Sequence, residues 1–206
     1  MRASAAVCLA LLAGCGSVDA PEEHWYRIEV PRPAPRAARQ GGVLRVAGLE
    51  LAPSLAGDRL QVAEGAVALR PFLLHHWAGP LDQMLTQGLV LGLARAELFA
   101  EVKGPAAPGG EDYVLSGHVL DCHAVRGPDG LAARITLRLQ LKDGAASHQP
   151  RVLCEAELTR TVAAEVAAPE PLVRALGRGF HELVEEWLVR SDEVLGAARA
   201  MAPKPR

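Results

Sequence analysis

ARITLRLQLK, residues 133–142, alternates apolar and polar side chains along most of its length. Its apolar positions are Ile135, Leu137, Leu139 and Leu141, and Arg, Thr and Gln occupy the positions between them. Because successive side chains of a β-strand point to opposite faces, this pattern predicts one buried face and one wet face. Such a pattern is typical of an antiparallel sheet that is open on one side. We therefore expect this stretch to form the middle of such a sheet.

Strand-like segments flank this stretch on both sides. DYVLSGHVLDCHAV (residues 112–125) precedes it across the turn signal RGPDG, and RVLCEAELTRTV (residues 151–162) follows it after DGAA. The alternation in the last segment places Val152, Cys154, Ala156 and Leu158 inward. Turn residues between alternating segments predict hairpins, so we expect three strands in sequence order.

Earlier strands are expected at WYRIEV (residues 25–30), at VLRVAGLEL (residues 43–51) and between residues 59 and 70. The glycine of AEGA (residues 63–66) predicts a turn inside the last of these. The intervening PRPAPRAARQGG (residues 31–42) is rich in proline and charge, which predicts an extended loop.

Two segments have helical periodicity instead. The first, residues 79–99, carries Leu81, Met84, Leu85, Leu89, Leu93 and Ala96 at helical spacing, and the second begins near residues 169–171 with the stripe Leu172, Leu176, Phe180, Leu183 and Trp187. Gly88 and Gly92 lie four residues apart, and we expect them to let the first helix pack closely on the sheet. Strands and helices do not alternate one for one. The predicted fold class is therefore α+β, an antiparallel sheet with two main helices packed on one face.

The bulk composition excludes some partners. The chain has 206 residues, which suits one domain, and a formal net charge of −2, which argues against nucleic acid. Its candidate membrane segment, LVLGLA (residues 89–94), is far shorter than the roughly 20 apolar residues that a spanning helix needs.

The N-terminus has the order of an export signal: Met1-Arg2, an apolar stretch from Ala5 to Ala13, then small residues before Cys15. LAGC (residues 12–15) resembles the bacterial lipobox, whose cysteine receives acyl chains such as palmitate and becomes the mature N-terminus. Cys8 follows a bulky Val7 and is a poor second candidate. Several acyl chains hold a protein firmly on a membrane without a spanning helix.

The chain then divides into four parts. Residues 1–14 are the predicted signal peptide, 15–25 the lipidated N-terminus and spacer, 26–190 the domain, and 191–206 a C-terminal tail. In Gram-negative bacteria an aspartate after the lipidated cysteine retains a lipoprotein in the inner membrane. Gly16 and Ser17 stand here instead, so we expect the outer membrane, with the domain on its periplasmic face.

Two cysteines remain after processing and lipidation, Cys122 and Cys154. If both hairpins close as expected, Cys122 lies opposite Ile135, and Ile135 lies opposite Leu158. The two cysteines are then two strands apart, about 9–10 Å, whereas a disulfide needs Cα atoms within about 7 Å. Free thiols are favoured, and a different strand order would reopen the question.

No pattern of catalytic or metal-binding residues is evident. His75 and His76 are adjacent, so on a strand they point to opposite faces and do not hold one metal together. LSGHV (residues 115–119) lacks the turn of a nucleophile elbow, and GPDG (residues 127–130) is explained as a turn. We expect no enzyme, cofactor or metal.

Several tracts together resemble one family, the ABC-type transport auxiliary lipoproteins, which include the outer-membrane lipoprotein of the paraquat-inducible (Pqi) system. They are LAGC, WYRIEVP, VLRVAGLELAPSLAGDRL (residues 43–60), HHWAGPLDQMLTQGL and DYVLSGHVLD. SLAGDR (residues 54–59) and the tract from Trp77 to Pro80 are the most telling. Two departures occur: LQVAEG replaces a Tyr-Arg after GDR, and PFLLHHW lacks tyrosines before the tryptophan.

The resemblance implies a non-enzymatic part in moving lipids or other hydrophobic molecules across the periplasm. Family members work with an ABC permease, its ATPase and a membrane-anchored substrate-binding protein of the MCE (mammalian cell entry) type, which the lipoprotein would dock. The alternative is an envelope assembly or structural lipoprotein that holds an outer-membrane protein and has no transporter. A homo-oligomer is left open.

One set of side chains is a candidate partner contact. Phe72, Leu73, Leu74 and Trp77 lie close together in sequence and are apolar. They form an exposed docking surface, or they pack under the first helix, which we favour for Trp77.

Overall fold

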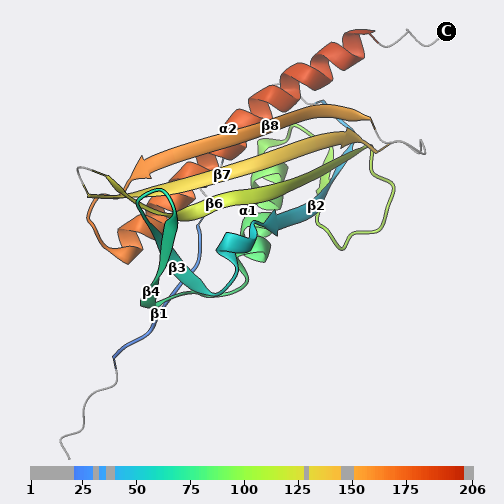
Figure 1. Cartoon of the computed structure of the whole chain (residues 1–206). Coiled ribbons are helices and arrows are strands. Elements are labelled where there is room, and N and C mark those ends of the chain that lie inside the picture. The colour runs from blue at the N-terminus through green and yellow to red at the C-terminus, as the bar shows by residue number, and fades with distance from the viewer. Residues whose placement is uncertain (1–20, 30–32, 36–39, 128–129, 145–150, 202–206) are drawn as a thin grey trace, which may run out of the picture.

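The computed structural model describes residues 21–29, 33–35, 40–127, 130–144 and 151–201. Within these residues the chain forms one eight-stranded sheet and two α-helices (Figure 1). The strands are β1 (His24–Tyr26), β2 (Val43–Leu51), β3 (Arg59–Glu64), β4 (Ala68–Trp77), β5 (Glu101–Lys103), β6 (Tyr113–Gly127), β7 (Gly130–Asp143) and β8 (Val152–Ala163). The helices are α1 (Leu81–Ala96) and α2 (Pro169–Met201), and a short 3-10 helix, η1 (Pro53–Leu55), follows β2.

The centre of the sheet is the meander β6–β7–β8, as the alternating pattern predicts. All three strands pair antiparallel with their chain neighbours. Ile135, Leu137, Leu139 and Leu141 are each 0% exposed, which confirms the predicted buried face of β7. The inward set predicted for β8 is only partly buried, because β8 lies at the edge of the sheet: Leu158 is buried, whereas Val152 is exposed.

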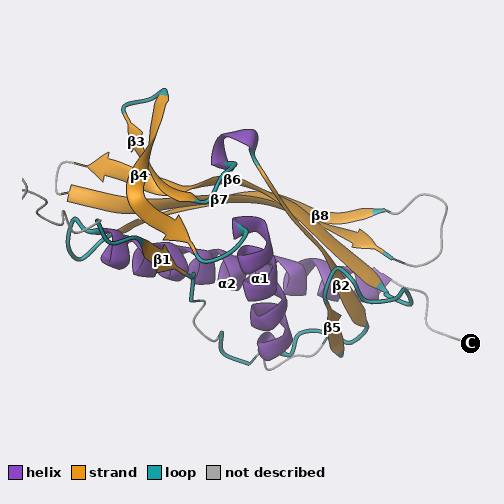
Figure 2. Ribbon diagram, turned by 90° about the horizontal axis from the view of Figure 1, so that it is seen from below, coloured by secondary structure: helices purple, strands orange, loops and turns teal. Residues whose placement is uncertain are grey.

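On its other side β6 pairs with two strands in succession. The part of β6 from Tyr113 to Val119 pairs with β2, whereas Ala124 and Val125 pair with β3. β5 then extends the β2 branch, and β4 and β1 extend the β3 branch. The sheet therefore forks, as Figure 2 shows, with β3 and β4 on one branch and β2 and β5 on the other.

The α+β class is confirmed, but the sheet is mixed rather than antiparallel throughout. Parallel pairing joins β2 to β6, β2 to β5, β3 to β6 and β1 to β4. Alternation reports which face of a strand is buried and carries no information on strand direction. Parallel neighbours need a long crossover, and β3, β4 and α1 supply it between β2 and β6.

The predicted register is correct for one hairpin and wrong for the other. Cys122 lies opposite Ile135 as expected, but Ile135 lies opposite Arg160 rather than Leu158. A slip of two residues keeps every side chain on its own face, so the hydrophobic pattern does not discriminate against it.

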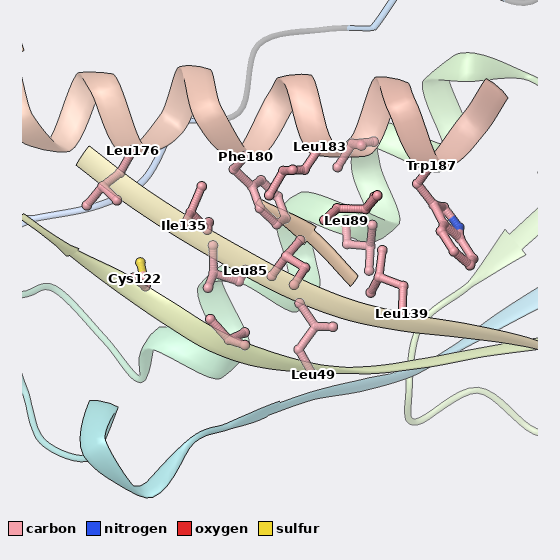
Figure 3. Packing of buried hydrophobic residues seen from close by; sticks show 14 of the residues in the cluster. Leu49, Leu85, Leu89, Cys122, Ile135, Leu139, Leu176, Phe180, Leu183 and Trp187 are labelled. Atoms are coloured by element: carbon pink, nitrogen blue, oxygen red, sulfur yellow. The ribbon is translucent and has the colours of Figure 1, made fainter. Parts of the chain in front are cut away.

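Both helices cover the same face of the sheet (Figure 2), as expected. The predicted stripe of α2 is buried. Figure 3 shows Leu176, Phe180, Leu183 and Trp187 of this stripe on the side of α2 that faces the sheet. The close approach at Gly92 has a different partner from the one expected. A Cβ placed on Gly92 would lie 3.3 Å from Cγ1 of Val184, which belongs to α2. This glycine therefore allows α1 to pack closely against α2 rather than against a strand.

α2 continues through most of the segment expected to be a tail. It runs to Met201, and Leu195 in its last turns is 2% exposed. The side-chain amide of Gln40 donates a hydrogen bond to Asp192 at 2.6 Å. The end of α2 therefore fastens the chain just before β2 to the rest of the domain.

Candidate functional site

The two tracts that are most telling in the sequence meet in space. The imidazole Nδ1 of His76 lies 3.1 Å from Oδ2 of Asp58, and the backbone N–H of Trp77 donates to the carbonyl of Asp58 at 2.6 Å. The hydrogen bond from His76 lowers the pKa of the Asp58 carboxyl. The loop after η1 is thus held against the end of β4.

The N-terminal strand docks onto the same end of β4. β1 pairs parallel with it, His24 beside His75, Trp25 beside His76 and Tyr26 beside Trp77. The strand is shorter than the expected residues 25–30, because after Tyr26 the chain leaves β4 and passes toward α2. The backbone N–H of Ala78 donates to the carbonyl of Tyr26 at 2.7 Å.

Ring contacts reinforce this pairing on both faces of β1. The imidazoles of His24 and His75 stack with centroids 5.1 Å apart, and the hydroxyl of Tyr26 lies 3.0 Å from Nδ1 of His75. On the other face the indole of Trp25 stacks on His76 at 4.7 Å. We call His24, Trp25, Tyr26, His75, His76 and Asp58 the histidine–aromatic cluster.

The chain beyond β1 is held by α2. A Cβ placed on Gly177 would clash with the carbonyl oxygen of Glu29, so the backbone of the N-terminal segment crosses α2 at a residue without a side chain. Tyr26 and Ile28 pack against the main core. The N-terminal segment is therefore part of the folded domain up to this crossing.

The predicted docking surface on β4 does not form as one exposed patch. Trp77 is 3% exposed and lies in the core, and Phe72 and Leu74 are half-buried. Leu73 is 71% exposed. On the neighbouring strand Trp25 is 57% exposed, which sequence reasoning did not single out. Cys15, Gly16 and Ser17 lie outside the described residues.

A cleft of about 580 Å³ opens where the first half of α1 lies beside β2. Beyond Arg45, β5 no longer pairs with β2, and the hydroxyl of Thr86 instead accepts the backbone N–H of Leu49 at 3.0 Å. Apolar side chains, Ala47, Leu49 and Pro105, form part of the lining. The other lining side chains are acidic, basic or uncharged polar groups: Glu50, Asp82, Gln83, Thr86, Gln87, Ser116, His118, Gln140 and Lys142. The cleft thus combines an open strand edge with hydrogen-bonding side chains.

Cys122 and Cys154 are free thiols, as favoured from the sequence. Cys154 lies opposite Leu141 and Cys122 opposite Ile135, so they belong to strands separated by β7. Burial raises the pKa of the Cys122 thiol to about 12, which leaves it protonated and unreactive near neutral pH.

Metal ligands do not gather in the part of the chain that the structure describes. Among these residues no group of three or more His, Cys, Asp or Glu side chains is placed to hold a metal ion. His75 and His76 face opposite sides of β4, since one contacts Tyr26 and the other Asp58. No helix within the described ranges has the length and apolar character to cross a membrane.

The family model for the ABC-type transport auxiliary lipoprotein component matches residues 26–186. The chain belongs to this family. The match begins in β1 and ends in α2, so it covers the histidine–aromatic cluster from Tyr26 onward, the cleft and the whole sheet except the first residues of β1. No curated protein sequence matches the chain.

Solved structures show that the fold of this family member recurs at low sequence identity. Protein XCC0632 from Xanthomonas campestris, of the DUF330 family, is 20% identical with a TM-score of 0.73 over 86% of this chain and 99% of that one. An uncharacterised protein is 17% identical with a TM-score of 0.67, over 83% and 99%. The hypothetical protein CT253 from Chlamydia trachomatis is 9% identical with a TM-score of 0.53, over 76% and 99%. These likenesses concern the fold alone.

Proposed function

We propose that this protein is a lipid-anchored, non-enzymatic accessory of an ABC-type transport system that moves lipids or other hydrophobic molecules across the periplasm. In this proposal it docks an MCE-family substrate-binding protein, and through it the permease and ATPase, at the outer membrane. The match of the family model over residues 26–186 is the observation that carries the proposal.

The lipid anchor is supported by LAGC at the end of an apolar stretch and by membership of a lipoprotein family. Cys15 is the proposed lipidated residue, and Gly16 and Ser17 are the proposed outer-membrane sorting residues. The first described strand begins nine residues after Cys15, so the domain follows the anchor on a short spacer.

Membrane fractionation in a Gram-negative host tests the anchor and the sorting separately. Cys15→Ala should release the protein from the membranes, while Cys8→Ala should leave it there. Gly16→Asp should move it from the outer-membrane to the inner-membrane fraction of a density gradient. Membrane association of Cys15→Ala would contradict the anchor, and an unchanged gradient position of Gly16→Asp would contradict the sorting role.

We place the partner contact at the cleft beside β2. An open strand edge presents backbone groups that a partner polypeptide can bond, and the lining side chains supply further donors and acceptors. Thr86 accepts the Leu49 N–H of this edge, and beyond Arg45 no strand among the described residues pairs with β2 on that side. Trp77 is only 3% exposed, so we leave it out of the proposed contact.

Crosslinking in membranes followed by affinity purification and mass spectrometry tests the partner. The expected product is an MCE-family protein. Ser116→Arg, which fills the cleft, should reduce this product at least fivefold. Thr161→Arg, at an exposed position on the same wet face of the sheet outside the cleft, should not. Recovery of an outer-membrane protein without any MCE protein would support a structural lipoprotein and overturn the transport proposal.

A further inference from the structure

Trp25 is a large apolar side chain that the domain holds in place and yet leaves exposed. Its backbone pairs with β4, and its indole stacks on His76, which is itself 5% exposed. Despite these contacts 57% of Trp25 is accessible. An indole that is held in place with half of its surface exposed offers apolar area that another surface can bury.

Leu73 adds apolar surface on the strand next to Trp25. It lies two residues before His75, the residue that pairs with His24 of β1. Two residues span about 7 Å along a strand, and neighbouring strands lie about 4.8 Å apart. The backbone at Leu73 therefore lies close to that of Trp25 at one edge of the β3 branch, and we call these two residues the β1–β4 edge.

The length of chain between Cys15 and Trp25 limits how far this edge can lie from the membrane. Ten residues separate Trp25 from Cys15, a chain that reaches at most about 36 Å. A domain of this size is about 40 Å across. An anchor at Cys15 therefore keeps Trp25 within about 36 Å of the bilayer, while the far side of the domain is free to lie further away.

We propose that the β1–β4 edge rests on the bilayer that carries the lipids of Cys15, with the indole of Trp25 at the level of the headgroups. Tryptophan suits this position because its ring is apolar and its N–H is polar, which is why it gathers at membrane interfaces. This inference rests on the lipid anchor of the proposed function and adds to it the orientation of the domain.

The charges around β1 indicate what drives the contact. Glu22, Glu23 and Glu29 accompany Arg27, so this stretch has no excess of positive charge that anionic lipids would attract. The contact must come from burial of the ring and of Leu73, and it should be insensitive to salt. In this orientation β8, at the other edge of the sheet, is turned away from the membrane.

Fluorescence quenching tests the inference because Trp25 is the exposed tryptophan of the three. Trp77 and Trp187 are 3% and 1% exposed. The natively lipidated protein is reconstituted in vesicles of phosphatidylethanolamine and phosphatidylglycerol, with or without lipids brominated at acyl carbons 6 and 7. The Trp25 contribution, obtained by subtracting Trp25→Phe, should fall at least twofold in brominated vesicles, at low salt and at 0.5 M NaCl alike.

Matched variants and vesicle flotation distinguish a failure of this inference from a failure of the lipid anchor. Leu73→Ser should reduce the quenching, whereas Val152→Ser, an exposed valine on β8, should not. Protein that floats with the vesicles and shows no bromine quenching would overturn this inference and leave the anchor intact; shielding of Trp25 by a protein or a second copy would give that result. Protein that does not float would remove the anchor and this inference with it.

Discussion

Thr86 shows how one hydroxyl protects the open edge of β2. Its side chain is 7% exposed and accepts the N–H of Leu49, a buried residue that has no strand on that side among the described residues. A buried backbone N–H without an acceptor lowers the free energy of unfolding by more than an ordinary hydrogen bond raises it, because the group loses its hydrogen bond to water and forms no other.

Thr86→Val should therefore lower the free energy of unfolding by about 1–3 kcal/mol, since it keeps the shape and removes the acceptor. Thr86→Ser keeps the acceptor and should lie much closer to the wild type. Urea denaturation of the three proteins measures the difference. Equal stabilities of the valine and serine variants would contradict this role of the hydroxyl.

His75 should make stability depend on pH. Burial, with His24 and His76 nearby, lowers its pKa from the ordinary 6.5. Its ring also faces the hydroxyl of Tyr26 and the ring of Phe72. Below about pH 6.5 the unfolded chain takes up a proton that the folded domain resists, so the free energy of unfolding falls as the pH drops through this range.

Urea denaturation between pH 7.5 and 5.5 measures this dependence. His75→Gln should show a shallower loss of stability than the wild type on acidification, although His123, whose pKa is also lowered, leaves part of the slope. Parallel pH profiles of the two proteins would show that His75 does not contribute.

At the scale of the element, the glycines of α2 differ in how closely another segment approaches them. Gly177 admits the backbone of Glu29, whereas Gly196 on the same helix has its nearest neighbour, the Gln40 amide, 3.8 Å from a Cβ position. Glycine within a helix costs about 1 kcal/mol relative to alanine, so it persists where a close approach requires it.

The two glycines should respond oppositely to alanine. Gly177→Ala should cost roughly 1–3 kcal/mol, because the carbonyl of Glu29 and the segment after β1 must move. Gly196→Ala should be neutral or stabilise by up to about 1 kcal/mol. Chemical denaturation compares the two, and limited proteolysis should cut the Gly177→Ala protein sooner near residues 24–29. Stabilisation by both substitutions would contradict the crossing.

At the scale of the whole molecule, β6 and β7 join every part of the domain. β6 has strands on both sides over most of its length, and α2 covers β7. β1, in contrast, is three residues long and pairs on one side. Local opening free energy follows the density of buried contacts, so stability should be uneven across the sheet.

Hydrogen exchange should reveal this gradient. Amides in the middle of β6 and β7 should exchange at the rate of global unfolding, and those of β1 at least tenfold faster. The order of these exchange rates should be the same when the β1–β4 edge is not in contact with the membrane. Equal protection of β1 and β7 would show that the β3 branch unfolds only together with the central hairpin.

Much of the local structure was predictable because it depends on periodicity. Alternation in residues 133–142 identified the buried face of β7, and helical spacing identified the stripes of α1 and α2. For the site, SLAGDR and the Trp77 tract were recognised as important, but their meeting through Asp58 and His76 was not. Trp25 was included only in an expected strand, since exposure leaves no periodic signal.

The sequence by itself determined both helices, most of the strands, the buried faces of β7 and α2 and the family, and it predicts a lipid anchor at Cys15, because each of these depends on neighbouring residues. The tertiary structure alone decided the mixed directions of the strands, the fork at β6, the register of β8 and the partner of Gly92. These depend on which distant segments meet. A parallel partner, a two-residue slip or a neighbouring helix leaves the apolar pattern of a segment unchanged, so only the packed domain discriminates among them.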